Sequence, residues 1–125
     1  ERIKCQPDTQ SKLHAVLVYF KEYSIHPPFV GGCPLMNAAI ESDDTDPKLK
    51  QVAKEIMLSL HQTIVALLDN GKKHGDVRSS FDSNGFASLM IGALEGGVMM
   101  MKVSDDSKHL KSVIDYIEKE INNLK

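Results

Sequence analysis

The sequence has no long apolar run and no cluster of basic residues, and each of these absences excludes a class of protein. A transmembrane helix needs about 20 uninterrupted apolar residues. The nearest stretch, from Phe86 to Met101, is interrupted by Ser88, Glu95 and several glycines, so we expect no membrane contact. The net charge is −2, and the lysines and arginines are scattered. A nucleic-acid surface gathers such residues against phosphates, so this chain alone is not expected to bind DNA.

Cysteine is also scarce. Cys5 and Cys33 lie far apart and match no zinc-binding spacing. A disulfide framework is therefore not expected, and the composition suits a reducing cytoplasm. Cys33 precedes a predicted helix N-terminus that would lower its thiol pKa and allow redox sensing. The other interpretation, which we favour, is a small buried residue in a turn. No signal peptide is visible, and the start at Glu1 suggests a piece of a longer protein or a processed product.

No catalytic or metal-binding arrangement is recognisable in the sequence. There is no His-x-x-x-His pair and no Glu-x-x-His pair of the kind found in di-iron bundles. His14 and His61 fall on apolar helix faces, where histidine is usually a core residue. No serine, lysine or carboxylate pair forms a nucleophile with its base. We therefore expect no enzyme activity, no metal and no cofactor.

Apolar residues recur at spacings of three and four and nowhere alternate as in a half-buried strand. This pattern predicts an all-α, multi-helix bundle, and the length suits one domain over residues 1–125. Helices are predicted over residues 11–24, 34–42, 47–70 and 83–103, with a last helix after residue 104. Proline at the first helical position and aspartate at the cap mark two of these starts. The predicted boundary residues are Pro34, Asp46, Pro47, Asn70, Gly71, Asp82 and Ser104, with Phe81 and Phe86 as a hydrophobic staple around Asp82.

The longest predicted helix, over residues 47–70, has two adjacent apolar stripes. So wide an apolar surface predicts a central helix that is buried on two sides.

The stretch "GALEGGVMMMKV", from Gly92 to Val103, is apolar nearly all round and contains three glycines. Each glycine costs a helix about 1 kcal/mol relative to alanine. Gly92 and Gly96 share one face, and close approach of another helix would explain them. We predict a homodimer in which the last two helices of each copy form a four-helix interface; a core helix in a monomer is the alternative. The predicted interface residues are Gly92, Gly96, Met100, Val113, Ile117 and Ile121.

Methionine and aromatic side chains on the earlier helices could line an adaptable small-molecule pocket. At the same spacing they could also be ordinary core. Glu95 stands amid apolar neighbours, where an unpaired charge would be costly. It could form a hydrogen bond across the dimer or into a pocket, or it could face solvent at the edge of the helix. The candidate ligand-binding residues are Leu17, Phe20, Tyr23, Met36, Met57, His61, Ile64 and Met90.

The segment "GGCPLMNAAIESDDTDPKLKQ", residues 31–51, resembles the C-terminal region of TetR-type transcriptional repressors. One branch of that family has Gly-Cys-Pro, an asparagine three residues later, an acidic patch and then a proline. The matching residues are Gly32, Cys33, Pro34, Asn37, Asp43, Asp44 and Pro47. The later "LEGGVMMMKVSDD" resembles the penultimate helix of the same branch, and the likeness extends over residues 11–125.

The resemblance implies an all-helical, cytoplasmic effector domain that dimerises through its last two helices and binds a small hydrophobic or aromatic effector. It also implies that effector binding shifts the first helix, moves attached DNA-binding heads and releases the operator, which is a shift between two populations. The helix-turn-helix head is missing from this sequence, so DNA contact is implied only through a segment outside it. A free-standing dimeric carrier or interaction module without a DNA role is the alternative.

Overall fold

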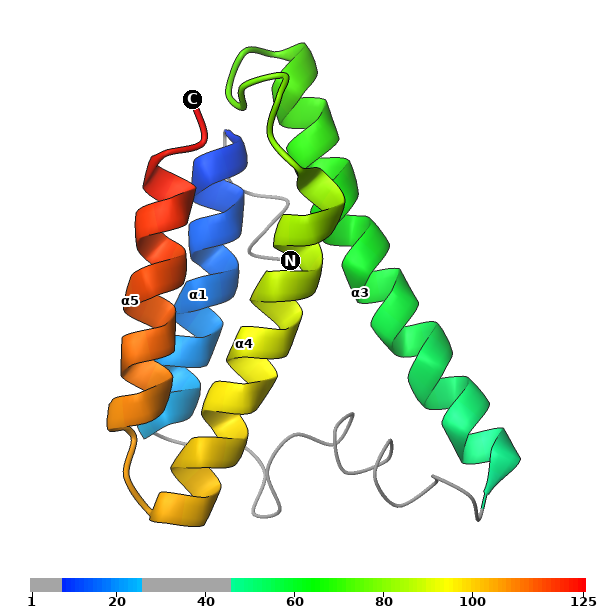
Figure 1. Ribbon diagram of the computed structural model, residues 1–125, viewed down its shortest axis with the longest axis vertical. Coiled ribbons are helices and arrows are strands. Elements are labelled where there is room, and N and C mark those ends of the chain that lie inside the picture. The colour runs from blue at the N-terminus through cyan, green and yellow to red at the C-terminus, as the bar shows by residue number, and fades with distance from the viewer. Residues whose placement is uncertain (1–7, 26–45) are drawn as a thin grey trace.

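A computed structural model describes residues 8–25 and 46–125, and every regular element in these ranges is an α-helix. The helices are α1 (Thr9–Ile25), α3 (Pro47–Lys73), α4 (Ser83–Ser104) and α5 (Lys108–Asn122). Helices α1, α4 and α5 stand together, while α3 meets the upper part of α4 and diverges from it towards Pro47 (Figure 1). The predicted all-α class is confirmed.

The core lies where α1, α4 and α5 meet, with the C-terminal half of α3 covering one side. Its side chains come from the stripes at three- and four-residue spacing that the sequence shows. The largest fully buried side chains are Leu13, Leu17, Leu68, Met90, Val98, Leu110, Ile114, Ile121 and Leu124.

Two helix starts follow the predicted capping pattern. The Asp46 side chain accepts a hydrogen bond from the Leu49 backbone N–H at 3.1 Å, and Pro47 begins α3. The Asp82 carboxylate accepts from the Gly85 N–H at 2.9 Å. The rings of Phe81 and Phe86 are 5.4 Å apart on either side of Asp82, which confirms the staple. Local sequence alone thus sets where α3 and α4 begin.

The prediction that Asn70 and Gly71 end α3 is wrong. The helix continues to Lys73, and the Gly71 carbonyl accepts the N–H groups of Asp76 and Val77 in the following turn. Gly71 has another role, because a Cβ there would lie 2.3 Å from Thr9 Oγ1 and 2.7 Å from Val77 Cγ2. Glycine at this position permits α1 and α3 to approach closely.

The predicted capping role of Ser104 is also wrong. Ser104 is the last residue of α4, and Asp105 follows it with a left-handed φ of 55°. Helix α5 begins at Lys108, whose N–H donates to Asp106 Oδ1 at 2.9 Å. Aspartate tolerates the left-handed region better than most residues, which lets the chain turn tightly between α4 and α5.

The expectation that the long helix is buried on two sides is wrong as well. Val52, Ile56, Met57 and Leu60 are 37–53% exposed, in the half of α3 that diverges from α4. The contacts that hold α3 lie further along, where Asp69 Oδ1 accepts from Ser83 Oγ at 2.8 Å and Gly71 meets α1. A wide apolar stripe shows that a helix can be covered, but it does not show by what.

Two polar contacts hold α1 against α5. Lys21 Nζ donates to Glu118 Oε2 at 2.8 Å, and the His14 Nε2 and Asn122 Oδ1 atoms are 3.1 Å apart. The hydrogen bond from Lys21 lowers the pKa of Glu118 below its ordinary 4.5. Since α1 is also packed on α5 through Leu13 and Leu17, these two helices form one unit.

The Lys21–Glu118 pair predicts a specific pH dependence of stability. A carboxylate with a lowered folded-state pKa stabilises the fold fully above pH 4.5, and this stabilisation is lost as the pH falls through the lowered value. Glu118→Gln should lower the free energy of unfolding at pH 7 by up to about 1 kcal/mol, as for other exposed pairs. Urea unfolding at pH 7 and pH 3 should show this difference shrinking in acid; an equal difference at both pH values would contradict it.

Helix α4 has the length and apolarity of a membrane span, with 22 residues and a mean hydropathy of 1.4. Length and composition therefore do not by themselves exclude a span. The structure buries part of this helix inside the domain. Met90, Leu94, Val98 and Met101 lie on its inner side, as in the core helix of a bundle.

Candidate functional site

One side of α4, next to its contact with α5, is apolar and open. It carries Leu89, Gly92, Gly96, Met99, Met100 and Val103, which we call the outward face of α4. Leu89, Met99, Met100 and Val103 are between 39% and 79% exposed. None of these six residues is charged, so the outward face of α4 is suited to burial against another apolar surface.

The three glycines of α4 separate into two kinds. Gly97 is buried, and a Cβ there would lie 3.2 Å from the Leu110 backbone, so it permits α5 to pack closely. A Cβ on Gly92 or Gly96 would meet nothing within 4 Å. Each of these two glycines still costs the helix about 1 kcal/mol. No close contact within the described residues requires glycine at these two positions.

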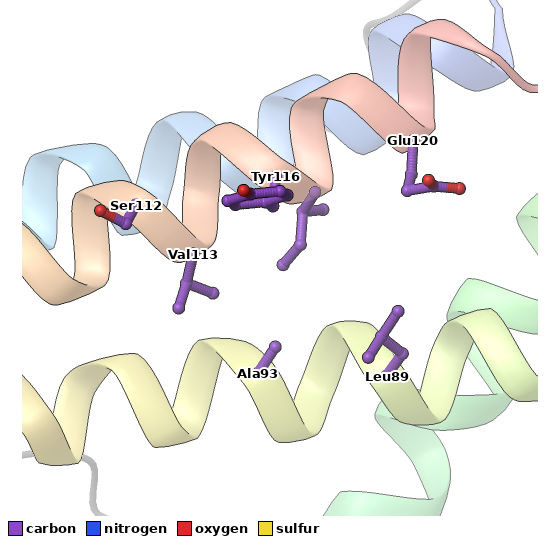
Figure 2. Close-up of a pocket in the computed structure, with 7 residues that line it drawn as sticks. Leu89, Ala93, Ser112, Val113, Tyr116 and Glu120 are labelled. Carbon is purple, nitrogen blue, oxygen red and sulfur yellow. The ribbon is translucent and has the colours of Figure 1, made fainter.

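A groove runs beside this face, between α4 and α5 (Figure 2). It has a volume of about 370 Å³ and is mostly apolar. The Leu89 and Ala93 side chains point from α4 towards α5, and Val113 points back from α5 towards α4. The Tyr116 ring, 71% exposed, has the Lys119 ammonium 5.0 Å from its centre. The lining residues are Leu89, Ala93, Ser112, Val113, Tyr116, Ile117 and Glu120.

A polar contact between side chains lies where α3 meets α4. His61 Nε2 is 3.0 Å from Ser88 Oγ and 3.3 Å from the Asn84 carbonyl oxygen. His61 is partly buried, whereas Met57, one turn earlier on α3, is exposed.

Two further cavities open on the surface of the described chain. One of about 670 Å³ lies along α3, from Thr63 to Lys73, and one of about 310 Å³ lies between α1 and α5, beside Lys21 and Lys111. Within residues 8–25 and 46–125, no group of three or more His, Cys, Asp or Glu is placed to hold a metal ion.

Residues 9–117 match the family described as "Tetracyclin repressor-like, C-terminal domain". The chain belongs to this family. Its fold is also similar to that of a TetR transcriptional regulator from Chloroflexus aurantiacus J-10-FL, with a TM-score of 0.90 and 31% identity. A TetR-family regulator from Cytophaga hutchinsonii gives a TM-score of 0.88 and 28% identity. No curated protein matches the chain.

The alignments cover nearly all of this chain but only part of each regulator. They include 97% of this chain and 61% of the Chloroflexus protein, and 99% of this chain and 62% of the Cytophaga protein. The chain therefore spans about three fifths of the length of these TetR regulators. What it shares with them is the C-terminal domain.

In this TetR-type domain the predicted interface residues fall into two groups. Gly92, Gly96 and Met100 lie on the outward face of α4, and Val113 lines the groove beside it. Ile117 and Ile121 are 3% and 0% exposed, and Ile117 also lines the groove. Both belong to the stripe with which α5 packs into its own core, and their place in a dimer interface stays a prediction.

Sequence reasoning missed three exposed apolar residues in the same region: Leu89, Val103 and Tyr116. The signal for two of them was present, because Leu89 and Val103 share the helical phase of Gly92 and Gly96. Tyr116 stands three residues after Val113 on α5, so the same spacing would have found it.

The predicted ligand-binding residues of the TetR-type domain come from three helices. Leu17, Tyr23, Ile64 and Met90 are buried in the core, and Phe20 is partly buried beside Tyr19 and Tyr23. Met57 and His61 lie in the middle of α3, and Met36 is outside the described residues, as is the predicted helix over 34–42. None of the seven described candidates lines the three cavities given above. Their role in ligand binding stays a prediction.

Proposed function

We propose that this domain is the effector-sensing and dimerisation part of a TetR-family transcriptional regulator. Membership of the family supports the regulatory role. The observation that carries the dimer is the outward face of α4, where Gly92 and Gly96 have no neighbour within 4 Å for an added Cβ. Two such faces, each with its α4–α5 groove, pack as a four-helix interface between two copies.

The effector is a small hydrophobic or aromatic molecule bound among α1, α3 and α4. It binds one of two arrangements of the domain better and so shifts their populations. Contact with DNA is made by N-terminal heads outside this chain, and the shift releases the operator in the cytoplasm. The close contact between Gly71 and Thr9 supports a route for this shift, because it joins the end of α3 to the first turn of α1.

An effector should raise the melting temperature of the domain. A ligand at 100 times its dissociation constant adds about 2.7 kcal/mol, which for a chain of this length is a shift of about 10 °C. Met57→Trp should abolish the shift by filling space at a candidate pocket position, whereas Leu58→Trp, at the next position and similarly exposed, should retain it. A panel of apolar and aromatic compounds, measured by differential scanning fluorimetry, tests this. Failure of the whole panel to shift either the wild type or Leu58→Trp would overturn effector sensing.

The alternative is a free-standing dimeric carrier or interaction module. The scattered lysines and arginines and the net charge of −2 are compatible with it. Both functions use the same dimer, and they differ in whether the natural gene product has a DNA-binding head. Its intact mass decides between them, since a helix-turn-helix head adds roughly 50 to 70 residues.

A further inference from the structure

Helix α4 contains four of the six methionines of the chain, and the structure places them in two different environments. Met90 and Met101 are 0% and 7% exposed and belong to the core of the domain. Met99 and Met100 are 47% and 39% exposed and lie on the outward face of α4. One helix therefore presents two methionine side chains to solvent and keeps two away from it.

An exposed methionine side chain can be oxidised by a hydroperoxide. A lone pair of the thioether sulfur forms a bond to one peroxide oxygen while the O–O bond breaks, and the proton of that oxygen moves to the departing oxygen. The sulfur loses two electrons and becomes a sulfoxide, and the peroxide is reduced to water or to an alcohol. The reaction replaces an apolar side chain by one with a strong hydrogen-bond acceptor.

The outward face of α4 has no donor for a sulfoxide oxygen. Its other members are Leu89, Gly92, Gly96 and Val103, whose side chains have no N–H or O–H group. The backbone N–H groups of the helix interior are already bonded within α4. On a separate copy, water hydrates the sulfoxide. Between two such faces the oxygen has no partner, and burying it opposes association.

We propose that Met99 and Met100 are a redox modification site, at which oxidation by a hydroperoxide keeps two copies of the chain apart. The inference rests on the proposed dimer and adds its regulation. Association covers the two side chains, so oxidation proceeds through the separate copies that are in equilibrium with the dimer. The dimer is thus sensitive to peroxide when the protein is dilute and resistant when it is concentrated.

Met57 provides an internal reference for the first measurement. It is 37% exposed, close to the value for Met100, but it lies on α3 and not on the outward face of α4. The 125-residue chain is treated with hydrogen peroxide at several protein concentrations, and tandem mass spectrometry follows the oxygen gained by each methionine. At about one hundred times the dissociation constant, roughly a tenth of the copies are separate. Oxidation of Met99 and Met100 should therefore be about tenfold slower there than in dilute protein, with the rate at Met57 unchanged.

The second measurement is the oligomeric state after oxidation, by light scattering with a thiol reductant present to keep the cysteines reduced. In the wild type the dissociation constant should rise about a hundredfold or more, while circular dichroism retains the helical signal. Methionine sulfoxide reductase should restore the dimer. The double variant Met99→Leu with Met100→Leu should stay dimeric after the same treatment. Met57→Leu is the matched control and should dissociate as the wild type does.

The outcomes separate the inference from the dimer on which it rests. A wild type that stays dimeric with both methionines oxidised overturns the inference and leaves the dimer in place. A double variant that dissociates like the wild type, or an oxidised protein that loses its helices, also overturns it. So does a dimeric wild type in which oxidation of Met99 and Met100 does not depend on protein concentration. A wild type that is monomeric before any treatment refutes the dimer and the inference together.

Discussion

Gly71→Ala should destabilise the domain by about 2 kcal/mol, in the middle of the range for adding one carbon to a packed site. The new Cβ would lie 2.3 Å from Thr9 Oγ1 and 2.7 Å from Val77 Cγ2. Both side chains are β-branched, stiff and nearly fully buried, so neither can move aside locally. The intrinsic gain in helix propensity, about 1 kcal/mol, is smaller than this overlap. For 125 residues the melting temperature should fall by about 8 °C.

A second variant distinguishes this overlap from a general effect of alanine. Thr9→Ala removes the closest atom, so Gly71→Ala combined with Thr9→Ala should lose less stability than the sum of the two single variants. Urea unfolding of the wild type, both single variants and the double variant provides the cycle. Simple additivity, or a Gly71→Ala protein as stable as the wild type, would show that α1 and α3 do not meet closely at this point.

The start of each helix could be predicted where the signal is local. Asp46 followed by Pro47, and Asp82 between two phenylalanines, specify a cap within a few residues, and the structure has both. The end of α3 could not be predicted, since Asn-Gly is the usual sequence of a helix end. Glycine at position 71 is explained instead by the close approach of Thr9. Such a contact joins residues far apart in the chain and cannot be predicted from the local sequence.

The candidate surfaces could also be predicted only in part. Periodicity placed Gly92 and Gly96 on one face, and the structure leaves that face open. For α5, the spacing of Ile117 and Ile121 indicated an apolar stripe but not its partner. A stripe that packs on the chain's own α1 and α4 has the same pattern as one that packs on a second copy. In the structure both isoleucines are buried in the chain's own core, and Ile117 also lines the α4–α5 groove.

The same arrangement shows which helices are tied together. Helix α1 is tied to α5 by Lys21–Glu118 and His14–Asn122, and α5 packs on α4 through Gly97. Helix α3 contacts the rest of the described chain mainly along its C-terminal half, and Val52, Ile56 and Leu60 in its N-terminal half are 40–53% exposed.

Gly96→Leu should convert the proposed dimer into a monomer. Within one chain nothing lies within 4 Å of the new Cβ, so the fold of each copy should be unaffected and α4 should gain helix propensity. Between two copies, a leucine at the closest approach forces the helices apart. A loss of about 3 kcal/mol in association would raise the dissociation constant more than a hundredfold. Light scattering coupled to size-exclusion chromatography, over a range of concentrations, measures the change.

Gln62→Leu is the matched control, because it adds a leucine at an exposed position on α3, away from the outward face of α4. It should remain as dimeric as the wild type, which separates a specific interface from a general effect of surface leucine. A Gly96→Leu protein that stays dimeric at the lowest concentration would refute the assignment to this face. A wild type that is monomeric throughout would refute the dimer itself. We expect Gly96→Leu to be monomeric and, at low concentration, to melt as the wild type does. This result would mean that the two glycines serve association and not the fold of the single chain.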